Sequence, residues 1–568
     1  MLIGIDLGTT NSLAACFRNG AVEIIPNRLG KKLTPSVVSV DEHLQVLIGD
    51  MAREYGFLHP DRTARLFKRT MGTDRTYVLG GQSFRSEELS ALILRSLKED
   101  AEVYLNEKID EAIISVPAYF NDKQRRATRT AGELAGLKVS RIINEPTASA
   151  LAYGVGEKDV SECCMVLDLG GGTFDVTILD YFRNIIEVYA VAGDNSLGGE
   201  DFTNVLIELF LKEHGISVDE LDLGTFAEIY KNAELCKCSL PNEGEIRMRA
   251  TVNGKVYESL ISLVRYETAC LSLLERLRFP IERSLRDAKI TLNDLDRIIM
   301  VGGGTRLQLV RRYIQKMTGV YSEYYIDPET SIAYGAAVAA AMKERDSEIS
   351  EVILTDVCPF TLGTEVLTGE GEFMDELRYL PIIERNTVIP VSHTETVYTS
   401  KDNQTRVSIK VLQGESRIPS ANLLIGRLDI EVPPGPKGQE AIEITYTYDV
   451  DSLLEVKIKV VSTGLEKTII IQDEDNRISE EEALERMKRL EYMTQNPRED
   501  EENEYALLKA NRIYEQADRE DRKQIEKQLE LFENAMDRGT RLEVDIQREK
   551  LLEVIDRIEN RNSSFLFS

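Results

Sequence analysis

The sequence predicts three folds in series: an α/β domain, an antiparallel β-sandwich and a short α-helical region. Residues 1–346 alternate strand-like runs with helical patterns and glycine-rich turns, which is typical of an α/β domain. Residues 357–474 alternate apolar and polar side chains between tight turns, and this pattern favours antiparallel sheets. Residues 475–568 carry apolar side chains at helical spacing among many charges, which indicates amphipathic helices. Because 568 residues are too many for one hydrophobic core, about three domains are expected.

Four strand-like runs that end in loops support the α/β prediction. They are Leu2–Asp6, Glu111–Val116, Met165–Leu169 and Arg297–Val301. Two of them enter a near-repeat, because Ile3-Gly-Ile-Asp-Leu-Gly-Thr-Thr10 returns as Val166-Leu-Asp-Leu-Gly-Gly-Gly-Thr173. The near-repeat predicts two similar subdomains that face each other.

The residue types of this near-repeat fit phosphate binding. Glycines allow backbone N–H groups to approach phosphate oxygens closely, and threonine hydroxyls add further donors. Asp6 and Asp168 would hold a hydrated Mg²⁺ between them, because two carboxylates that face a phosphate chain need a cation. A third glycine loop, Val301–Arg306, also lies between a strand-like run and a helical one. Three such loops predict a nucleotide site, and none has the spacing of a P-loop or of a Rossmann dinucleotide motif.

The segment Ser347–Val357 joins the α/β domain to the β-sandwich. It begins with acidic residues and continues with the apolar run Val352, Ile353 and Leu354, whereas a plain linker would be polar. Two interpretations stay open: the segment starts the first strand of the β-sandwich, or it docks reversibly on a neighbouring domain.

The helical region begins with a capping box, Ser479 with Glu482, and is interrupted at Asn496-Pro497. Apolar residues then follow at helical spacing. They are Leu484, Met487 and Leu490, then Ile525, Leu529, Phe532 and Met536, and finally Leu551, Ile555 and Ile558. The simplest interpretation is that these side chains pack one helix on another.

Composition excludes several classes of protein. A net charge of −28 argues against nucleic acid or an anionic membrane as a partner. There is no run of eighteen apolar residues and no basic start followed by an apolar segment, so neither a membrane span nor a secretory signal is expected. The seven cysteines and four histidines lack metal-ligand spacing, which favours reduced thiols in a cytoplasmic protein over disulfides or zinc.

Several motifs together resemble a known family. IGIDLGTTNS, VPAYFNDKQRRAT, RIINEPTASALAYG, LDLGGGTFDVT, SLGGEDF, VGGGTR and AYGAAVAAA occur in this order, followed by TDVCPFTLGTE and DNQTRVSIKVLQGE. They closely resemble the seventy-kilodalton heat-shock (DnaK-type) chaperones over residues 1–475. Shortened regions before Val116 and in 220–250, with the short helical end, resemble the divergent bacterial HscC-like subgroup.

The resemblance implies an ATP-dependent chaperone with an actin-like ATPase domain (1–346), a hydrophobic linker (347–356), a β-sandwich that grips extended peptides (357–474) and a helical lid (475–568). Slow ATP hydrolysis would switch the sandwich between low and high affinity for extended hydrophobic segments of unfolded proteins. The implied partners are such polypeptides and a J-domain co-chaperone. The need for a nucleotide exchange factor stays open, and a monomer is expected.

The resemblance also implies the residues of an ATP or ADP site with Mg²⁺, and with K⁺ as a further candidate ion. The phosphate ligands would be Gly8, Thr9, Thr10, Asn11, Gly171, Gly172 and Thr173, with Gly198 and Gly199 beside them. The adenosine would lie against Glu234, Lys237, Gly303, Gly304, Thr305 and Arg306. Lys68 would reach the γ-phosphate and orient the attacking water, while Glu145, Asp175 and Thr173 would complete the catalytic network with Asp6 and Asp168. Such phosphoryl transfer depends mainly on positioning and charge stabilisation.

At the adenosine side the chain departs from the family pattern. Cys238 stands where the family has an arginine that packs on adenine, and Pro241 replaces a hydroxyl residue. A stacked guanidinium contributes on the order of 1–2 kcal/mol when it is desolvated, so nucleotide affinity is expected to be about 5–30-fold weaker.

Further residues match the family's coupling and peptide-binding positions. Pro117 and Arg125 would switch domain docking with nucleotide state, and Arg141, Asn144, Thr147 and Asp356 would form the J-domain surface. The peptide groove would be lined by Thr364, Leu367, Val397, Ser400, Val407, Ile409 and Val411. The alternation sends Val407, Ile409 and Val411 to one face of a strand, where they could equally be sandwich core.

Two other functions are weighed against the chaperone. An actin-fold ATPase or small-metabolite kinase would share the phosphate loops, and so would an actin-like filament protein. Neither explains the linker, the β-sandwich and the helices in 357–568. Phosphate release that needs no small-molecule acceptor and rises with peptide would favour the chaperone.

Overall fold

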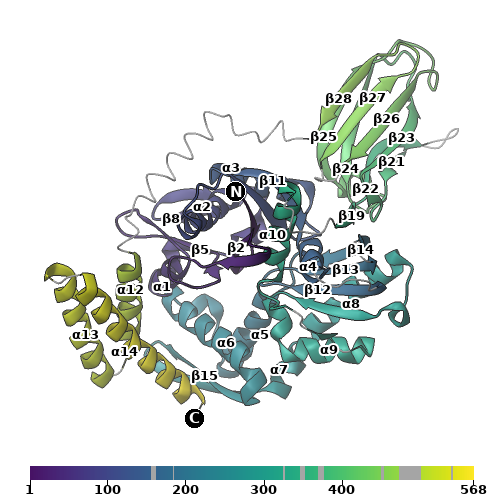
Figure 1. Cartoon of the computed structure of the whole chain (residues 1–568). Helices are drawn as coiled ribbons and strands as arrows, with labels where there is room; N and C mark the ends of the chain where they lie inside the picture. The colour runs from purple at the N-terminus through teal and green to yellow at the C-terminus, as the bar shows by residue number, and fades with distance from the viewer. Residues whose placement is uncertain are drawn as a thin grey trace.

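The structure is a computed structural model of the whole chain (Figure 1). It describes residues 1–154, 161–182, 185–320, 322–323, 326–345, 352–368, 376–449, 453–471, 501–517, 519–538 and 541–567. The acidic start of the linker lies outside these residues, and so do the capping box at Ser479 and the break at Asn496-Pro497.

The α/β domain has two halves with matching sheets. In the first half (residues 1–154) the strand order is β11-β10-β1-β2-β3, and in the second half (residues 161–345) it is β18-β17-β12-β13-β14. In each sheet the first three strands are parallel and the last two run antiparallel to their neighbours. This shared topology confirms the two similar subdomains that the near-repeat predicts.

The strands of the first half begin with a fully buried apolar run that ends in Asp6. They are β1 Leu2–Asp6, β2 Asn11–Arg18, β3 Ala21–Ile25, β4 Thr34–Pro35, β5 Val37–Val40, β6 Val46–Ile48, β7 Thr63–Arg65, β8 Thr76–Leu79, β9 Gln82–Arg85, β10 Glu111–Val116 and β11 Lys138–Asn144. The helices are α1 Asp50–Leu58, α2 Ser86–Leu105, α3 Asp122–Leu134 and α4 Glu145–Gly154. The helix α10 (Ser331–Glu344) returns to this sheet, where a Cβ on Gly4 would lie 2.2 Å from the nitrogen of Ala337. The small residues of α10 therefore allow close helix–sheet packing.

The second half carries the other copy of the motif and more helices. Its strands are β12 Ser161–Leu169, β13 Phe174–Phe182, β14 Ile185–Asp194, β15 Glu245–Val252, β16 Lys255–Ser262, β17 Arg297–Val301 and β18 Ser322–Glu323. Its helices are α5 Gly199–His214, α6 Leu223–Glu243, α7 Leu263–Ala269, α8 Leu271–Ala288 and α9 Gln308–Thr318. The four strands predicted from the sequence are thus confirmed, with β12 starting earlier than expected.

The apolar part of the linker forms the strand β19 (Ile353–Val357). It pairs in parallel with β14 of the α/β domain, and its end pairs antiparallel with β22 (Val388–Ile389) of the β-sandwich. Val352 and Leu354 pack against the α/β core. The strand therefore docks on one domain and joins the other. That the docking is reversible stays a prediction.

The β-sandwich consists of the sheets β21-β20-β24-β25 and β23-β26-β27-β28. Their strands are β20 Leu362–Thr368, β21 Glu376–Ile383, β23 Val391–Tyr398, β24 Arg406–Gln413, β25 Leu423–Glu431, β26 Ala441–Tyr448, β27 Leu454–Val460 and β28 Glu466–Ile470. Burial alternates along β26 and β27, as the period-two pattern predicts. The buried faces of both sheets form one core.

The C-terminal bundle consists of α12 (Glu501–Gln516), α13 (Arg519–Arg538) and α14 (Arg541–Phe567). Its core contains the predicted Ile525, Phe532, Leu551, Ile555 and Ile558. The bundle packs against α1 and β15, far from the β-sandwich in Figure 1. The described helices of the expected lid therefore do not cover the sandwich in this arrangement.

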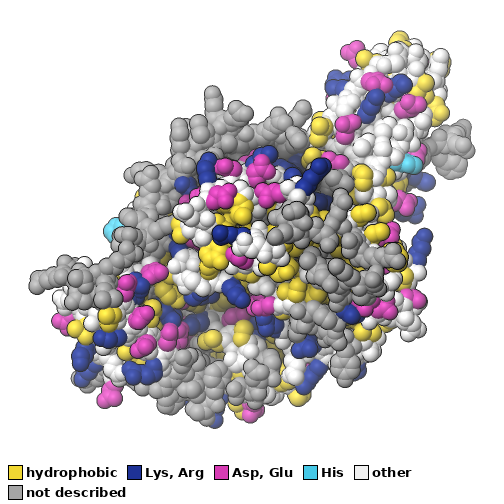
Figure 2. Space-filling model, viewed as in Figure 1, with side chains coloured by type: hydrophobic (Ala, Val, Ile, Leu, Met, Phe, Trp, Pro, Cys, Tyr) yellow, Lys and Arg dark blue, Asp and Glu magenta, His cyan; other side chains and the backbone are white. Residues whose placement is uncertain are grey.

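Acidic and basic side chains are interspersed over the face shown in Figure 2, on the α/β domain and on the C-terminal bundle alike. Among the described helices, none combines the length and the apolar character needed to cross a bilayer.

Candidate nucleotide-binding and catalytic site

A cavity of about 1140 Å³ lies between the two halves of the α/β domain. The loops after β1 and β12 face each other across it, which follows from their equivalent places in the two sheets. Most of the predicted site residues line it. They are Asp6, Gly8, Thr9, Thr10, Asn11, Lys68, Glu145, Asp168, Gly171, Thr173, Gly199, Glu234, Lys237, Gly303, Gly304 and Arg306.

The remaining predicted residues, Gly172, Asp175, Gly198 and Thr305, are not among the lining residues of the cavity. Gly198 supports the phosphate loop from behind, because a Cβ there would lie 2.4 Å from the nitrogen of Gly172. Thr305 is buried, and its hydroxyl donates to the carbonyl of Gly302 at 2.7 Å. Its hydroxyl is thus used within its own loop, and its place beside the adenosine stays a prediction.

Lys68 is buried inside the cleft, not on the surface. It lies in a short 3₁₀ helix, Phe67–Thr70, and only 3% of it is exposed. Its Nζ lies 2.7 Å from Oε1 of Glu145, and 5.5 Å from the centroid of the Phe120 ring. This pair places one cation and one carboxylate beside the two phosphate loops.

Three buried aspartates lie in or beside this site, and two of them, Asp6 and Asp168, line the cavity. Oδ1 of Asp6 accepts a hydrogen bond from Ser115 at 2.9 Å, and Oδ1 of Asp175 accepts one from the backbone N–H of Tyr119 at 3.2 Å. Within the part of the chain that the structure describes, Oδ2 of Asp168 and Oδ2 of Asp175 are buried without a hydrogen-bond partner. Buried carboxylate oxygens without partners are costly unless a cation or water meets them.

Crowding of these carboxyl groups changes their titration. Burial, with the charge of Glu145, raises the pKa of Asp6 to about 7. Burial and Glu145 raise the pKa of Asp175 to about 8, and burial with the charges of Glu145, Asp175 and Asp6 raises that of Asp168 well above its ordinary value. A divalent cation would favour the ionised forms, so this donor set fits Mg²⁺. No three described His, Cys, Asp or Glu side chains are grouped to hold a metal ion.

The expected adenosine side is formed by α6 and the third glycine loop. Glu234 and Lys237 pair at 2.7 Å, and Lys237 also donates to the carbonyl of Gly199 at 3.1 Å. Cys238 is exposed, with its Sγ 3.7 Å from Oε1 of Glu234. Arg306 is paired with Asp327 at 2.7 Å.

The predicted coupling residues form a buried chain of hydrogen bonds from the α/β domain to the linker strand. After the buried Pro117, Arg125 donates to the carbonyls of Ala118 and Phe120, and to Oδ1 of Asn144 at 2.6 Å. Asn144 and Thr147 then donate to Oδ2 of Asp356 at 2.9 and 3.0 Å.

The residues of the expected J-domain surface differ in burial. Asn144, Thr147 and Asp356 are buried against one another in this arrangement, and their role toward a J-domain stays a prediction. In this arrangement they hold the linker strand, whereas Arg141 is half-buried on β11.

The predicted groove residues divide into two groups. Val407, Ile409, Val411 and Thr364 are buried, and the first three belong to the core of the sandwich. Leu367 is 40% exposed, while Val397 and Ser400 are half-buried. Of the predicted groove residues, only Leu367, Val397 and Ser400 are therefore accessible to a peptide in this arrangement.

Some residues of the site were not predicted. Ser115 on β10 donates to Asp6, and Tyr119 just after this strand donates to Asp175. Tyr119 belongs to the motif VPAYFNDKQRRAT, but neither residue is predicted from the sequence to contact a carboxylate. Arg69 pairs with Asp201 at 2.6 Å across the two halves. Four residues of the C-terminal bundle also line the cavity, namely Tyr505, Lys509, Arg512 and Glu559. These residues are far along the chain from the phosphate loops, and no motif in the sequence links them to the cavity.

Comparisons with known proteins identify the family of the chain. The family model described as Hsp70 protein matches residues 2–80 and 75–564. A protein named Chaperone protein DnaK from Thermosipho melanesiensis is 40% identical over 495 residues, covering 85% of this chain and 81% of that protein. Another of that name from Thermotoga petrophila is 41% identical over 496 residues, covering 85% and 82%. A third from Thermosipho africanus is 39% identical over 501 residues, covering 84% and 82%. The chain belongs to the Hsp70 family, and it is an ATP-dependent molecular chaperone that hydrolyses ATP.

Proposed function

We propose that the cleft binds ATP with its phosphates between the loops Gly8–Asn11 and Gly171–Thr173. The observation that carries this proposal is the buried pair of Lys68 and Glu145 beside two aspartates at the ends of matching strands. Backbone N–H groups of the glycine loops and the hydroxyls of Thr9, Thr10 and Thr173 supply donors for phosphate oxygens.

The roles of the charged residues follow from their positions. The ammonium of Lys68 would stabilise charge on the γ-phosphate and orient a water, with Glu145 and Asp175 accepting protons from that water. Asp6 and Asp168 would hold Mg²⁺ through water. That ion would supply charge neutralisation for the phosphates when bound. K⁺ remains a further candidate ion.

Coupling to the β-sandwich is proposed to run through the buried hydrogen-bond chain. Tyr119 links Asp175 to the loop that Arg125 holds, and Asn144 links Arg125 to Asp356 on β19. The β-sandwich also contacts the α/β domain directly, because Arg385 pairs with Asp287 on α8 at 2.8 Å. A change at the nucleotide could thus alter the docking of the linker strand.

Extended segments of unfolded proteins are the proposed clients, and a J-domain protein is the proposed co-chaperone. Leu367, Val397 and Ser400 would contact the peptide first, with the core residues reached when the sandwich rearranges. The domain boundaries 1–346, 347–356, 357–474 and 475–568 remain our proposal, as does a monomer in the cytoplasm.

Single-turnover ATP hydrolysis tests this function in the full chain. Lys68→Ala should bind nucleotide and lose hydrolysis by about 10²-fold or more, because its charge-stabilising group is removed. Lys108→Ala is the matched control, since the Lys108 side chain is 77% exposed. Hydrolysis should rise with an extended apolar peptide and with a J-domain. Parent-like hydrolysis by Lys68→Ala would refute the assigned role.

A further inference from the structure

The C-terminal bundle bridges the two halves of the α/β domain at the mouth of the nucleotide cleft. Its helix α12 packs against α1 of the first half, and α14 packs against β15 of the second half. Figure 1 shows the bundle beside α1 and β15. The cavity that holds the phosphate loops is lined at this end by Arg512 and Glu559.

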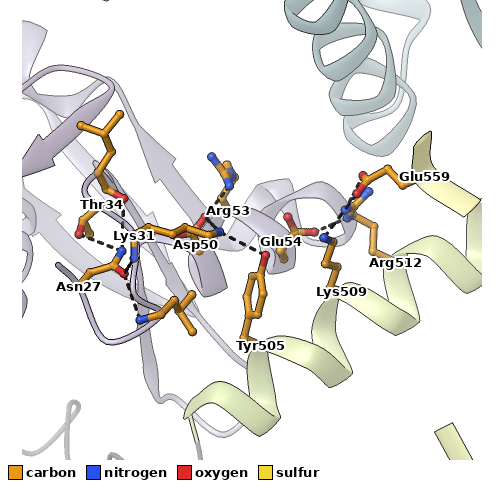
Figure 3. A network of polar contacts seen from close by, with 12 residues as sticks. Asn27, Lys31, Thr34, Asp50, Arg53, Glu54, Tyr505, Lys509, Arg512 and Glu559 are labelled. Atoms are coloured by element: carbon orange, nitrogen blue, oxygen red, sulfur yellow. Dashed lines mark hydrogen bonds and ion pairs between the residues drawn. The ribbon is translucent and has the colours of Figure 1, made fainter. Parts of the chain in front are cut away.

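The contact with the first half combines a buried ion pair and an apolar patch. Arg512 is 1% exposed and pairs with Glu54 of α1 (Figure 3). Its guanidinium also lies 5.3 Å from the ring centroid of Phe57. Tyr505 is buried in a cluster with Met51 and other residues of the first half. Its hydroxyl accepts a hydrogen bond from Lys31 at 3.4 Å.

The contact with the second half continues the same network. Glu559 of α14 lies 2.9 Å from Arg512 and 3.2 Å from Nζ of Lys231 on α6. Charges therefore alternate from Glu54 through Arg512 and Glu559 to Lys231. The first and last members belong to opposite halves of the domain, so the bundle links them.

The network requires every partner. Burial alone would raise the pKa of Glu559, but the charges of Arg512 and Lys231, with the hydrogen bond from Arg512, lower it to about 2. Burial and the charge of Arg512 lower the pKa of Lys231, although Glu559 opposes this. Removing one partner leaves an uncompensated buried charge, which is strongly unfavourable. The docked bundle is thus sensitive to single substitutions.

We propose that the C-terminal bundle is a strap across the nucleotide cleft, which holds the two halves together and slows the release of bound nucleotide. The inference rests on the proposed nucleotide site. Release of the nucleotide requires either that the two halves move apart or that the opening of the cleft is uncovered. Either change requires the bundle to leave α1 or α6. Through this strap the chain regulates its own nucleotide exchange.

Release of fluorescently labelled ADP, chased with excess ATP, tests the strap in the full chain. Glu54→Gln and Glu559→Gln should each speed release by at least about tenfold, because each leaves Arg512 without one carboxylate. Glu549→Gln is the matched control, since Glu549 is exposed on the same helix α14. Glu54→Gln leaves the bundle sequence intact, so a folding defect of the bundle does not explain its result.

A second readout reports docking itself. The chain has no tryptophan, so Tyr505→Trp introduces a single indole into the buried contact. Its emission should shift to the red when Glu54→Gln is added. The strap is overturned if the emission shifts while release keeps the parent rate, or if neither changes. Failure of the parent chain to bind labelled ADP would instead contradict the proposed nucleotide site.

Discussion

The hydrogen bonds to Asp356 make the docking of the linker strand measurable. Asp356→Ala removes the acceptor of Asn144 and Thr147, whose donors lie 2.9 and 3.0 Å from its carboxylate. Hydrogen bonds to a charged group contribute about 1.5–3 kcal/mol each, and the two share one oxygen, so about 2–4 kcal/mol is expected. This corresponds to a loss of about 30–700-fold in the docked population.

Hydrogen exchange measures this change at the backbone of residues 353–357. In the parent chain with ATP, pairing of β19 with β14 should protect these amides. Protection should fall by the calculated factor in Asp356→Ala, and peptide should no longer stimulate hydrolysis. Ile353→Thr is the control on the same strand, because Ile353 is 57% exposed and threonine keeps the β-branched shape. Unchanged protection in Asp356→Ala would refute the role of this carboxylate in docking.

Two more predictions concern the nucleotide and the strap. Cys238→Arg should raise nucleotide affinity by about 5–30-fold in titration calorimetry, because α6 then presents a guanidinium for stacking on the base. An unchanged affinity would show that no base stacks there. The docked bundle should tolerate pH 6–8 and detach only in acid. Glu559 has a folded pKa of about 2, below its ordinary 4.5, so its stabilisation is complete above pH 4.5 and is lost as pH falls towards 2. The fluorescence emission of Tyr505→Trp measures this detachment. Detachment between pH 6 and 8 would contradict the predicted acid dependence.

The phosphate loops and their strands could be predicted because their signal is local. A buried apolar strand, an aspartate and a glycine-rich turn fix both the backbone and the chemistry within ten residues, as at Asp6 and Asp168. Their meeting across the cleft then follows from the shared strand order of the two halves.

The expected J-domain surface shows what local motifs leave open. A motif identifies Asn144 and Thr147, but their burial depends on whether β19 lies against them. The linker pattern leaves these two placements open, and only the pairing of β19 with both β14 and β22 shows that the strand joins the two domains. Whether these side chains are exposed therefore depends on how the domains are arranged. The local sequence is the same in either arrangement, so it does not predict their exposure.

The strap could not be predicted, for a related physical reason. Tyr505, Lys509 and Arg512 form a stripe on α12 beside the apolar stripe that packs in the bundle, and such charges are usually solvated. Arg512 is buried where α12 packs on α1, and there it pairs with Glu54, 458 positions earlier in the chain. A buried ion pair adds little net stability compared with apolar packing, yet it strongly disfavours wrong partners. A contact that must hold the cleft closed and also release it is better served by such charges than by a large apolar face.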